Sequence, residues 1–358
     1  MQFKIVLVPF LATTILPVWC QKQQPILRPQ VTTIEQPLIG FGTYLLTQTR
    51  SSESDNTTAA VSFAIQTGYR QIDCAAYYKN ERAVGRGIAE GLLKANLSRS
   101  DIWVTSKLWN DRHGDYDVVE ATFNKTLSDL GLEYLDLYLL HWPVDSSSGK
   151  SKIDYIKTWN AMSNLPKSKV RNIGISNFSP EQLCHLISET GVKPAVHQME
   201  LHPYLQQSSW VAAHRALGIS VTAYSPLGNS SPDYRHSPTP SRFSSLKSIL
   251  RSCFSSNEKD ITPPPPPLLQ NTLLKEIAER RNCSVAQVAL SWNVGRGVSV
   301  IPKSSHERWI KENYESLECE LGVFDFAQLE EVGAKYLTRF SNPSEEWGVE
   351  LFRGLDDA

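Results

Sequence analysis

The sequence predicts an α/β protein built as a single (β/α)8 TIM barrel, and two observations carry that prediction. From residue 38 onward, eight short runs rich in Val, Ile, Leu and Tyr alternate with amphipathic stretches of helical period. The runs also lack strict apolar–polar alternation, which is typical of parallel strands covered on both faces. Eight strand–helix units in succession close into a barrel, and a length of ~250 residues or more is ordinary for one.

Each unit begins with an expected strand, and the strands cover residues 38–42, 69–73, 102–107, 135–141, 170–176, 195–200, 219–225 and 298–303. The expected helices cover 57–66, 81–95, 115–130, 153–165, 180–190, 207–217 and 272–293, and a last one starts near residue 307. The alternative fold is an open doubly wound sheet, which would need a Gly-x-Gly-x-x-Gly turn after an early strand. Gly85-Arg86-Gly87 lacks the third glycine and lies inside an expected helix, so the barrel is favoured.

The ends of the chain and one internal segment depart from this pattern. Residues 1–20 are typical of a signal peptide, because Lys4 precedes an apolar stretch over 5–16 and the small Val18 and Cys20 flank a cleavage position. We therefore expect the secretory pathway, with a cytoplasmic location as the main alternative. The remaining boundaries are an N-terminal extension at 21–37, the barrel at 38–340, a Ser/Pro-rich insertion at 229–267 after the seventh strand, and a C-terminal tail at 341–358.

The net charge and the cysteine spacing argue against several classes of protein, such as nucleic-acid-binding and zinc-binding proteins. The net charge of −1 does not favour a nucleic-acid partner. The one long apolar run lies at the N-terminus and is too short to span a bilayer comfortably, which excludes a polytopic membrane protein. The six cysteines are scattered without a Cys-x-x-Cys pair, so we expect ordinary thiols and neither a disulfide framework nor a metal site. Asn-x-Ser/Thr sequons, which matter only in the secretory pathway, begin at Asn56, Asn96, Asn124, Asn177, Asn229 and Asn282.

Four polar residues at or just after strand ends form a chemically coherent set: Asp73, Tyr78, Lys107 and His141. The C-terminal strand ends of a barrel share one rim, where active sites are built. A nearby ammonium such as Lys107 is expected to lower the pKa of the Tyr78 phenol, while Asp73 holds the lysine charged. His141 would hydrogen-bond a substrate oxygen. The set predicts a general acid that protonates a carbonyl oxygen while hydride reaches the carbon.

The motifs around these residues resemble the aldo-keto reductase family, and most closely its fungal NADP-dependent aldehyde and carbonyl reductases. The resemblance runs from about residue 38 to 340 without the insertion, and it implies a nicotinamide-dependent reductase on a barrel without a Rossmann motif. The motifs are Gly40-Phe41-Gly42-Thr43, Gly68-Tyr69-Arg70-Gln71-Ile72-Asp73, Tyr78-Lys79-Asn80-Glu81, Ser106-Lys107-Leu108-Trp109, Leu140-His141-Trp142-Pro143, Gly174-Ile175-Ser176-Asn177-Phe178, Ala223-Tyr224-Ser225-Pro226-Leu227-Gly228 and Ile301-Pro302-Lys303-Ser304.

The resemblance also implies a role for each site residue. Tyr78 would be the proton donor, Lys107 and Asp73 its tuning pair, and His141 the group that orients the carbonyl. The tail at 341–358 would lie near the substrate, and Tyr44, Trp109 and Trp142 would line an aromatic substrate pocket. The residues implied in binding NADPH are Thr43, Ser176, Asn177, Gln198, Tyr224, Ser225, Leu227, Lys303, Ser304, Arg308 and Asn313.

One departure bears on the cofactor, and two alternatives bear on the function. The family usually places a phosphate-binding arginine where this chain has Trp309, and Arg308 lies one residue earlier, so NADH is the alternative to NADPH. The partner expected is a small-molecule carbonyl compound, and the protein is expected to be a monomer. One alternative function is a regulatory subunit that keeps the cofactor fold with little turnover. The other, a Schiff-base aldolase using Lys107, is disfavoured because Asp73 would keep that amine charged.

Overall fold

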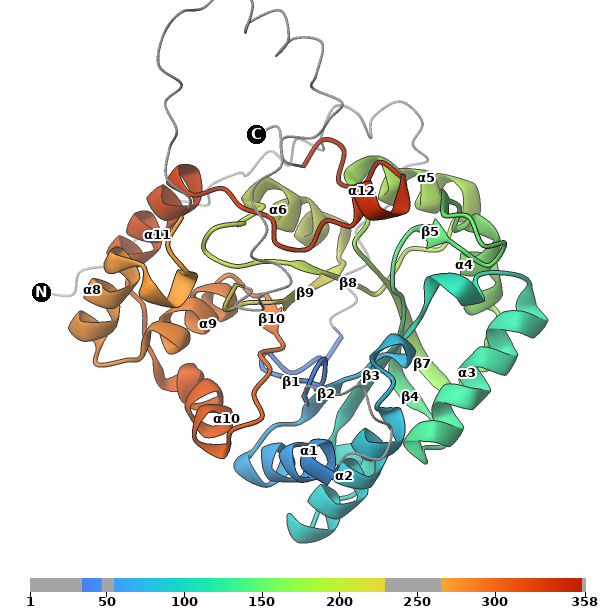
Figure 1. The fold of residues 1–358 in the computed structure, drawn as a ribbon, viewed down its shortest axis with the longest axis horizontal. Coiled ribbons are helices and arrows are strands. Elements are labelled where there is room, and N and C mark those ends of the chain that lie inside the picture. Colours follow the sequence, from blue (N-terminus) through green and yellow to red (C-terminus); the bar gives the residue numbers. More distant parts are fainter. Residues whose placement is uncertain (1–33, 47–54, 229–264, 356–358) are drawn as a thin grey trace, which may run out of the picture.

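The computed structural model describes residues 34–46, 55–228 and 265–355. Its central feature is a sheet of eight parallel strands in the order of the chain, surrounded by helices (Figure 1). Residues next to β1 close the ring: Ile39 bridges Val300, and the Gly40 amide donates to the Val300 carbonyl at 2.7 Å. The predicted (β/α)8 barrel is therefore confirmed. The strands are β1 (Phe41–Gly42), β2 (Gln71–Asp73), β3 (Trp103–Leu108), β4 (Leu135–Leu140), β7 (Val170–Ser176), β8 (Val196–Glu200), β9 (Ser220–Tyr224) and β10 (Ser299–Val300).

The helices form the outer layer, and most of them begin and end within three residues of the predicted bounds. A short hairpin, β5 (Val144–Asp145) and β6 (Lys152–Ile153), follows β4. The helices are α1 (Asp55–Thr67), α2 (Glu81–Lys94), α3 (Tyr116–Leu130), α4 (Ile156–Ser163), α5 (Pro180–Thr190), α6 (Ser208–Leu217), α8 (Thr272–Arg281), α9 (Val285–Gly295), α10 (Glu307–Tyr314), α11 (Val323–Lys335) and α12 (Ser344–Trp347).

The single helix predicted at 272–293 is wrong, because the structure has two helices there. Asn282 ends α8 with a left-handed backbone (φ 54°), a conformation in which asparagine is tolerated better than most residues. Ser284 then caps α9, and its side chain accepts from the Gln287 amide while Gln287 bonds back to the Ser284 amide. This reciprocal capping box was readable in the sequence as Ser-x-x-Gln.

The expectation of ordinary thiols is also corrected. Cys283 and Cys319 form a disulfide across a sequence separation of 36 residues. The bridge joins the short link between α8 and α9 to the segment that follows α10, whereas Cys74 is a free, buried cysteine. The sequence analysis missed the pairing because spacing alone does not say which cysteines meet in space.

Close strand packing places the residues that follow β7. Gly174 lies in β7, where an added Cβ would stand 2.4 Å from the Val196 carbonyl oxygen of β8. A larger residue would therefore push the two strands apart. Ser176 pairs with Gln198 in the register of these strands, so this glycine helps to bring two predicted site residues together.

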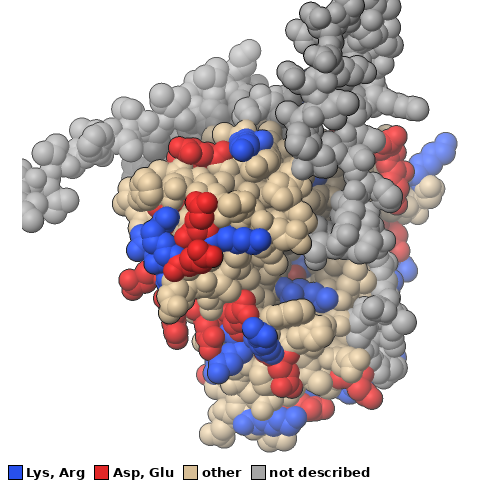
Figure 2. All heavy atoms as spheres, turned by 60° about the vertical axis from the view of Figure 1, so that its left-hand side comes forward, with Lys and Arg blue, Asp and Glu red and all other residues tan. Residues whose placement is uncertain are grey.

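Several predicted segments lie wholly or mostly outside the described residues: the signal peptide at 1–20, the extension at 21–37 up to residue 33, and the insertion at 229–267 up to residue 264. Within the described part of the chain, no helix combines the length and apolar character needed to cross a bilayer. Acidic and basic side chains are interspersed on the face shown in Figure 2. The net charge of −1 is consistent with that mixture.

Candidate active site

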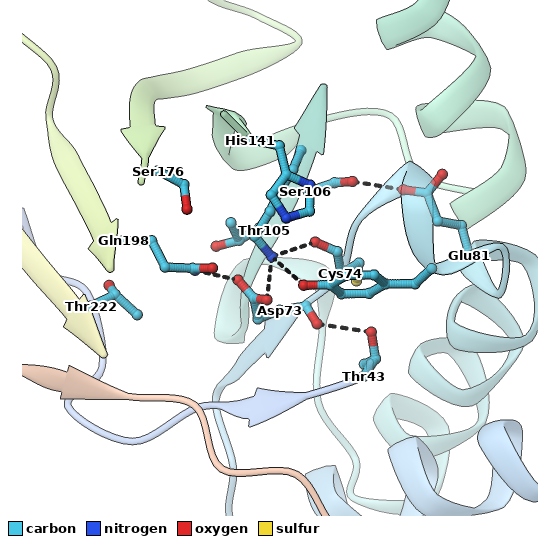
Figure 3. A network of polar contacts seen from close by, with 12 residues as sticks. Thr43, Asp73, Cys74, Glu81, Thr105, Ser106, His141, Ser176, Gln198 and Thr222 are labelled. Carbon is cyan, nitrogen blue, oxygen red and sulfur yellow. Dashed lines mark hydrogen bonds and ion pairs between the residues drawn. The ribbon is translucent and has the colours of Figure 1, made fainter. Parts of the chain in front are cut away.

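The four residues of the predicted catalytic set converge at the C-terminal ends of β2, β3 and β4. Figure 3 labels two of them, Asp73 and His141. Asp73 is the last residue of β2, Lys107 lies near the end of β3, and His141 directly follows β4. Tyr78 comes from a short 3-10 turn at Ala76–Tyr78 after β2. Parallel pairing of these neighbouring strands brings all four side chains to one rim, as the sequence analysis expected.

Lys107 lies at the centre of the set, and its side chain is fully buried. Its Nζ donates to Asp73 Oδ1, to the Cys74 carbonyl at 2.9 Å and to Tyr78 Oη at 3.2 Å. An ammonium has three N–H donors and no acceptor, so these contacts use its whole hydrogen-bonding capacity. The Tyr78 oxygen accepts from Lys107, and its own proton is left to point away from the lysine.

Asp73 is held from both sides. Its Oδ2 accepts from Gln198 Nε2 at 2.7 Å, opposite the lysine contact, and its backbone carbonyl accepts from Thr43 Oγ1 at 2.9 Å. The ion pair with Lys107 is almost completely excluded from solvent. A buried charge needs a partner with further hydrogen bonds to offset the loss of water, and both conditions are met here.

The pKa of Tyr78 is shifted in the direction opposite to the sequence-based expectation. Burial, followed by the charge of Asp73, raises the pKa of the Tyr78 phenol well above its ordinary value. The expectation that Lys107 lowers this pKa is therefore wrong for the protein without a bound cofactor. In the resting site, the hydrogen bond from Lys107 does not offset the combined effect of burial and the Asp73 charge on this pKa. A protonated phenol at neutral pH is the form that can donate a proton.

His141 is held neutral beside this phenol. Burial, and then the charge of Lys107, lowers the pKa of the His141 imidazole well below its ordinary value. Its ring lies edge-on to Tyr78, with centroids 6.0 Å apart, and edge-on to Trp109 at 5.0 Å. Its Nδ1 is a buried polar atom without a hydrogen-bond partner among the described residues. A neutral imidazole with unused hydrogen-bonding capacity can bind a small polar group placed next to Tyr78.

The residues predicted to hold a nicotinamide form a connected polar group beside Asp73. Asn177 has a left-handed backbone (φ 64°), and its Nδ2 donates to the His141 carbonyl at 3.1 Å and to Ser176 Oγ at 3.0 Å. The Tyr224 hydroxyl donates to Asn177 Oδ1 at 2.7 Å. The Gln198 amide nitrogen donates a hydrogen bond to Asp73, and the Gln198 side-chain carbonyl oxygen remains as an acceptor. The group therefore presents a hydroxyl, amide oxygens and an aromatic ring.

Two further predicted cofactor residues follow Tyr224, and four lie after β10. Ser225 has a left-handed backbone (φ 47°) and begins a turn closed by the Gly228 amide on its carbonyl at 2.9 Å, while Leu227 packs against the core. Ser304 is buried and its Oγ accepts from the His306 amide at 3.1 Å. Lys303 and Arg308 are exposed at the surface, and Asn313 is buried on α10. One continuous segment thus carries Lys303, Ser304, Arg308 and Asn313.

Aromatic side chains surround the other side of the catalytic set. Tyr44 lies 5.0 Å from the Tyr78 ring, between centroids, and Trp109 lies next to His141. Trp142 is buried against Trp347 of α12, with centroids 5.1 Å apart. The tail therefore packs on two of the three predicted pocket residues, because Trp347 also meets Trp109 at 6.0 Å.

Sequence reasoning missed Tyr77, whose ring stacks on Trp109 at 3.7 Å. It lies next to Tyr78, but adjacency in sequence gives no sign that two neighbouring tyrosines face different partners. Among the described residues, no cluster of His, Cys, Asp or Glu could hold a metal ion. The groups at this rim thus supply proton donors, acceptors and aromatic surface.

Comparison with known proteins gives one consistent result. A sequence profile described as the Aldo/keto reductase family matches residues 38–334. An uncharacterized oxidoreductase of Schizosaccharomyces pombe is 39% identical over 337 residues, covering 90% of this chain and 92% of that protein. The aldo-keto reductase family 1 member A1 of Rattus norvegicus is 39% identical over 308 residues, covering 82% of each chain.

Solved structures agree with this result. A Bombyx mori aldo-keto reductase in complex with NADP superimposes with a TM-score of 0.73 at 31% identity, covering 88% of this chain and 95% of that one. The aldose reductase of Giardia lamblia gives a TM-score of 0.72 at 32% identity, covering 88% and 98%.

Proposed function

The chain belongs to the aldo/keto reductase family of oxidoreductases, and from its site we propose that it reduces an aldehyde or ketone to an alcohol with NADPH. One observation carries the proposal. A protonated Tyr78 hydroxyl, fixed by Lys107, lies beside the neutral His141, with aromatic side chains around them. This arrangement suits a carbonyl oxygen that gains a proton.

The proposed roles of the protein's own groups follow from their contacts. The carbonyl oxygen of the substrate accepts hydrogen bonds from Tyr78 and from a ring N–H of His141, and these bonds polarise the carbonyl. NADPH, when bound, would supply the hydride that the carbonyl carbon accepts. As negative charge grows on the oxygen, Tyr78 transfers its proton, and Lys107 stabilises the phenolate that results. The aromatic rings exclude water and favour apolar substrates.

The residues present fit a nicotinamide cofactor. Gln198 offers a carbonyl oxygen, Ser176 a hydroxyl and Asn177 an amide oxygen, which match the donors and acceptors of a carboxamide. The orphaned Nδ1 of His141 indicates that the adjacent space takes a polar group. Lys303 supplies a charge that favours NADPH over NADH, because only NADPH carries the adenosine 2′-phosphate. The bound NADP of the Bombyx mori enzyme supports this choice.

Absorbance of NADPH during incubation with a panel of apolar aldehydes and ketones tests the proposal. Sustained turnover, many product molecules per enzyme molecule, is expected with at least some of them. Binding of NADPH without sustained consumption would contradict the proposed reaction and would favour a subunit that only holds the cofactor. Parallel reactions with NADH measure the cofactor preference.

A further inference from the structure

A buried carboxylate lies directly behind the catalytic set, on a residue to which neither the family resemblance nor the proposed reaction gives a role. Glu81 is the first residue of α2 and is only 6% exposed. It follows Tyr78 by three positions, after Lys79 has turned the chain through a left-handed conformation (φ 58°). Glu81 therefore begins the helix that directly follows the Tyr78 turn.

Glu81 ties that turn to the strand that carries the lysine. Ser106 Oγ donates to Glu81 Oε1 at 2.7 Å, and Ser106 immediately precedes Lys107 on β3. Figure 3 shows this contact on the opposite side of the group from the Gln198–Asp73 contact. A longer contact, from Thr126 Oγ1 on α3 to Glu81 Oε2 at 3.4 Å, completes its hydrogen-bond environment. Successive strand residues point to opposite faces, so Ser106 faces the helices while Lys107 faces the barrel.

The same turn is tied a second time, at the neighbouring residue. Asn80 Nδ2 donates to the Thr43 carbonyl at 2.9 Å, and Thr43 in turn donates to the Asp73 carbonyl. The two contacts lead to different strands, β1 through Asn80 and β3 through Glu81. Together these two contacts fix the residues that follow Tyr78 relative to β1 and β3.

We propose that Glu81 is a positioning residue, which sets the separation between Tyr78 Oη and Lys107 Nζ through its hydrogen bond with Ser106. That separation is 3.2 Å, at the long end of the range for such a bond. A shift of a few tenths of an ångström would therefore cost the contact that stabilises the phenolate. Glu81 itself touches neither the phenol nor the ammonium, and it acts only through the backbone of the turn. The inference rests on the proposed reduction.

The proposed role of Glu81 requires a hydrogen-bond acceptor at this position and does not require a negative charge. Burial is the largest cause that raises the pKa of Glu81 to about 7, with Asp129 of α3 adding to the rise and Lys125, Ser106 and Thr126 opposing it. The nearby Cys74 and Tyr138 are themselves buried and protonated. The Ser106 hydroxyl can donate to a carboxylate oxygen, to the carbonyl oxygen of a protonated carboxyl or to that of an amide. A positioning role thus needs an acceptor and does not need the charge.

Three single variants, one double variant and one control variant test this. Glu81→Ala should lower kcat roughly 10-fold or more, since small misplacements of reacting groups carry losses of this order. Ser106→Ala should lower kcat by a similar factor, and the double variant should lose no more than either single one, because both remove the same bond. Glu81→Gln should keep kcat within about twofold, because the amide still accepts. The control Thr126→Ala removes the longer contact to Glu81 and keeps the Ser106 contact, so kcat should stay unchanged.

The readouts separate positioning from a general defect. The Kd for NADPH, measured by fluorescence titration, should stay near the wild-type value in every variant, and the kcat–pH profile of Glu81→Gln should superimpose on that of the wild type. Multiplicative losses in the double variant, an unchanged kcat in Ser106→Ala, or a pH profile altered by Glu81→Gln would each overturn the proposal. If Glu81→Ala fails to fold, the kcat of Ser106→Ala and the pH profile of Glu81→Gln still test the proposal. A wild-type protein that reduces no carbonyl compound would instead overturn the proposed function.

Discussion

At the scale of single residues, the chemistry depends on how the lysine divides its three protons. Lys107 donates one hydrogen bond to a carboxylate, one to a backbone carbonyl and one to the Tyr78 oxygen. The phenol can therefore direct its own proton only away from the lysine. The sequence placed these residues at one rim because the barrel pattern was regular. It could not give the raised pKa of Tyr78, which depends on how deeply the side chain is buried.

The first prediction concerns that proton. Tyr78→Phe should abolish carbonyl reduction, since loss of a positioned general acid typically costs ~10²–10⁴-fold in rate. Binding of NADPH should be nearly unchanged, because the hydroxyl bonds to Lys107 and faces the carbonyl. Steady-state kinetics and a cofactor titration on the same preparation check both halves. Turnover within about threefold of the wild type would contradict the mechanism.

The second prediction concerns the cofactor charge. Lys303→Met should weaken NADPH binding roughly 10- to 100-fold, because a hydrogen bond to a charged group contributes about 1.5–3 kcal/mol. NADH, which has no 2′-phosphate, should bind as before. Lys311→Met is a matched control on α10, since Lys311 pairs with Glu315 at 3.7 Å on the surface. Equal weakening of both cofactors would show that Lys303 has a structural role and that the phosphate binds elsewhere.

At the scale of elements, the segment that carries the predicted phosphate and adenine residues is enclosed by a covalent bond. The Cys283–Cys319 disulfide closes a loop that contains α9, β10 and α10, and with them Lys303, Ser304 and Asn313. The sequence analysis predicted helices at both ends of this loop and still missed the bridge. Helical period is a local property, whereas the pairing of cysteines depends on how α9 and the segment after α10 pack.

The third prediction follows from this bridge. Cys283→Ser should lower the free energy of unfolding by about 4 kcal/mol on the loop-entropy relation for a loop of this length. Cys319→Ser should have the same effect, and the double variant should lose no more than either one. Denaturant unfolding with and without reductant checks this: reductant should destabilise the wild type more than it destabilises the serine variants, which keep the disulfide-bonded Cys184. A wild type indifferent to reductant would show that the bridge does not contribute to stability.

At the scale of the whole molecule, the regular features were predictable and the closing contacts were not. The barrel could be predicted from the alternation of strands and helices, because each strand and each helix has its own hydrophobic period within a short stretch of sequence. The bridge between Ile39 and Val300 and the packing of Trp347 on Trp142 join parts of the chain that lie far apart in sequence. No local pattern encodes such contacts. The predicted substrate pocket is thus the part of the candidate site that depends most on the complete fold.

The last prediction concerns where the molecule is made. We propose that residues 1–20 direct the chain into the secretory pathway, and the Cys283–Cys319 bridge supports this, because disulfides persist in oxidising compartments. Expressed in a eukaryotic host, the protein should then carry glycans on the exposed sequons Asn56, Asn96 and Asn282. Asn177 should stay unmodified, because its side chain is buried and bonded to Ser176 and Tyr224.

Mass spectrometry before and after glycosidase treatment checks these sites, and Asn177 serves as the internal control. The opposing argument is that an NADPH-dependent reductase needs a reduced cofactor pool, which the cytosol supplies and the extracellular space does not. A compartment inside the secretory pathway would satisfy both requirements, since it is oxidising for thiols and still within the cell. A product that retains residues 1–20, carries no glycan and has free thiols at Cys283 and Cys319 would contradict the proposed targeting and place the enzyme with the cytosolic cofactor.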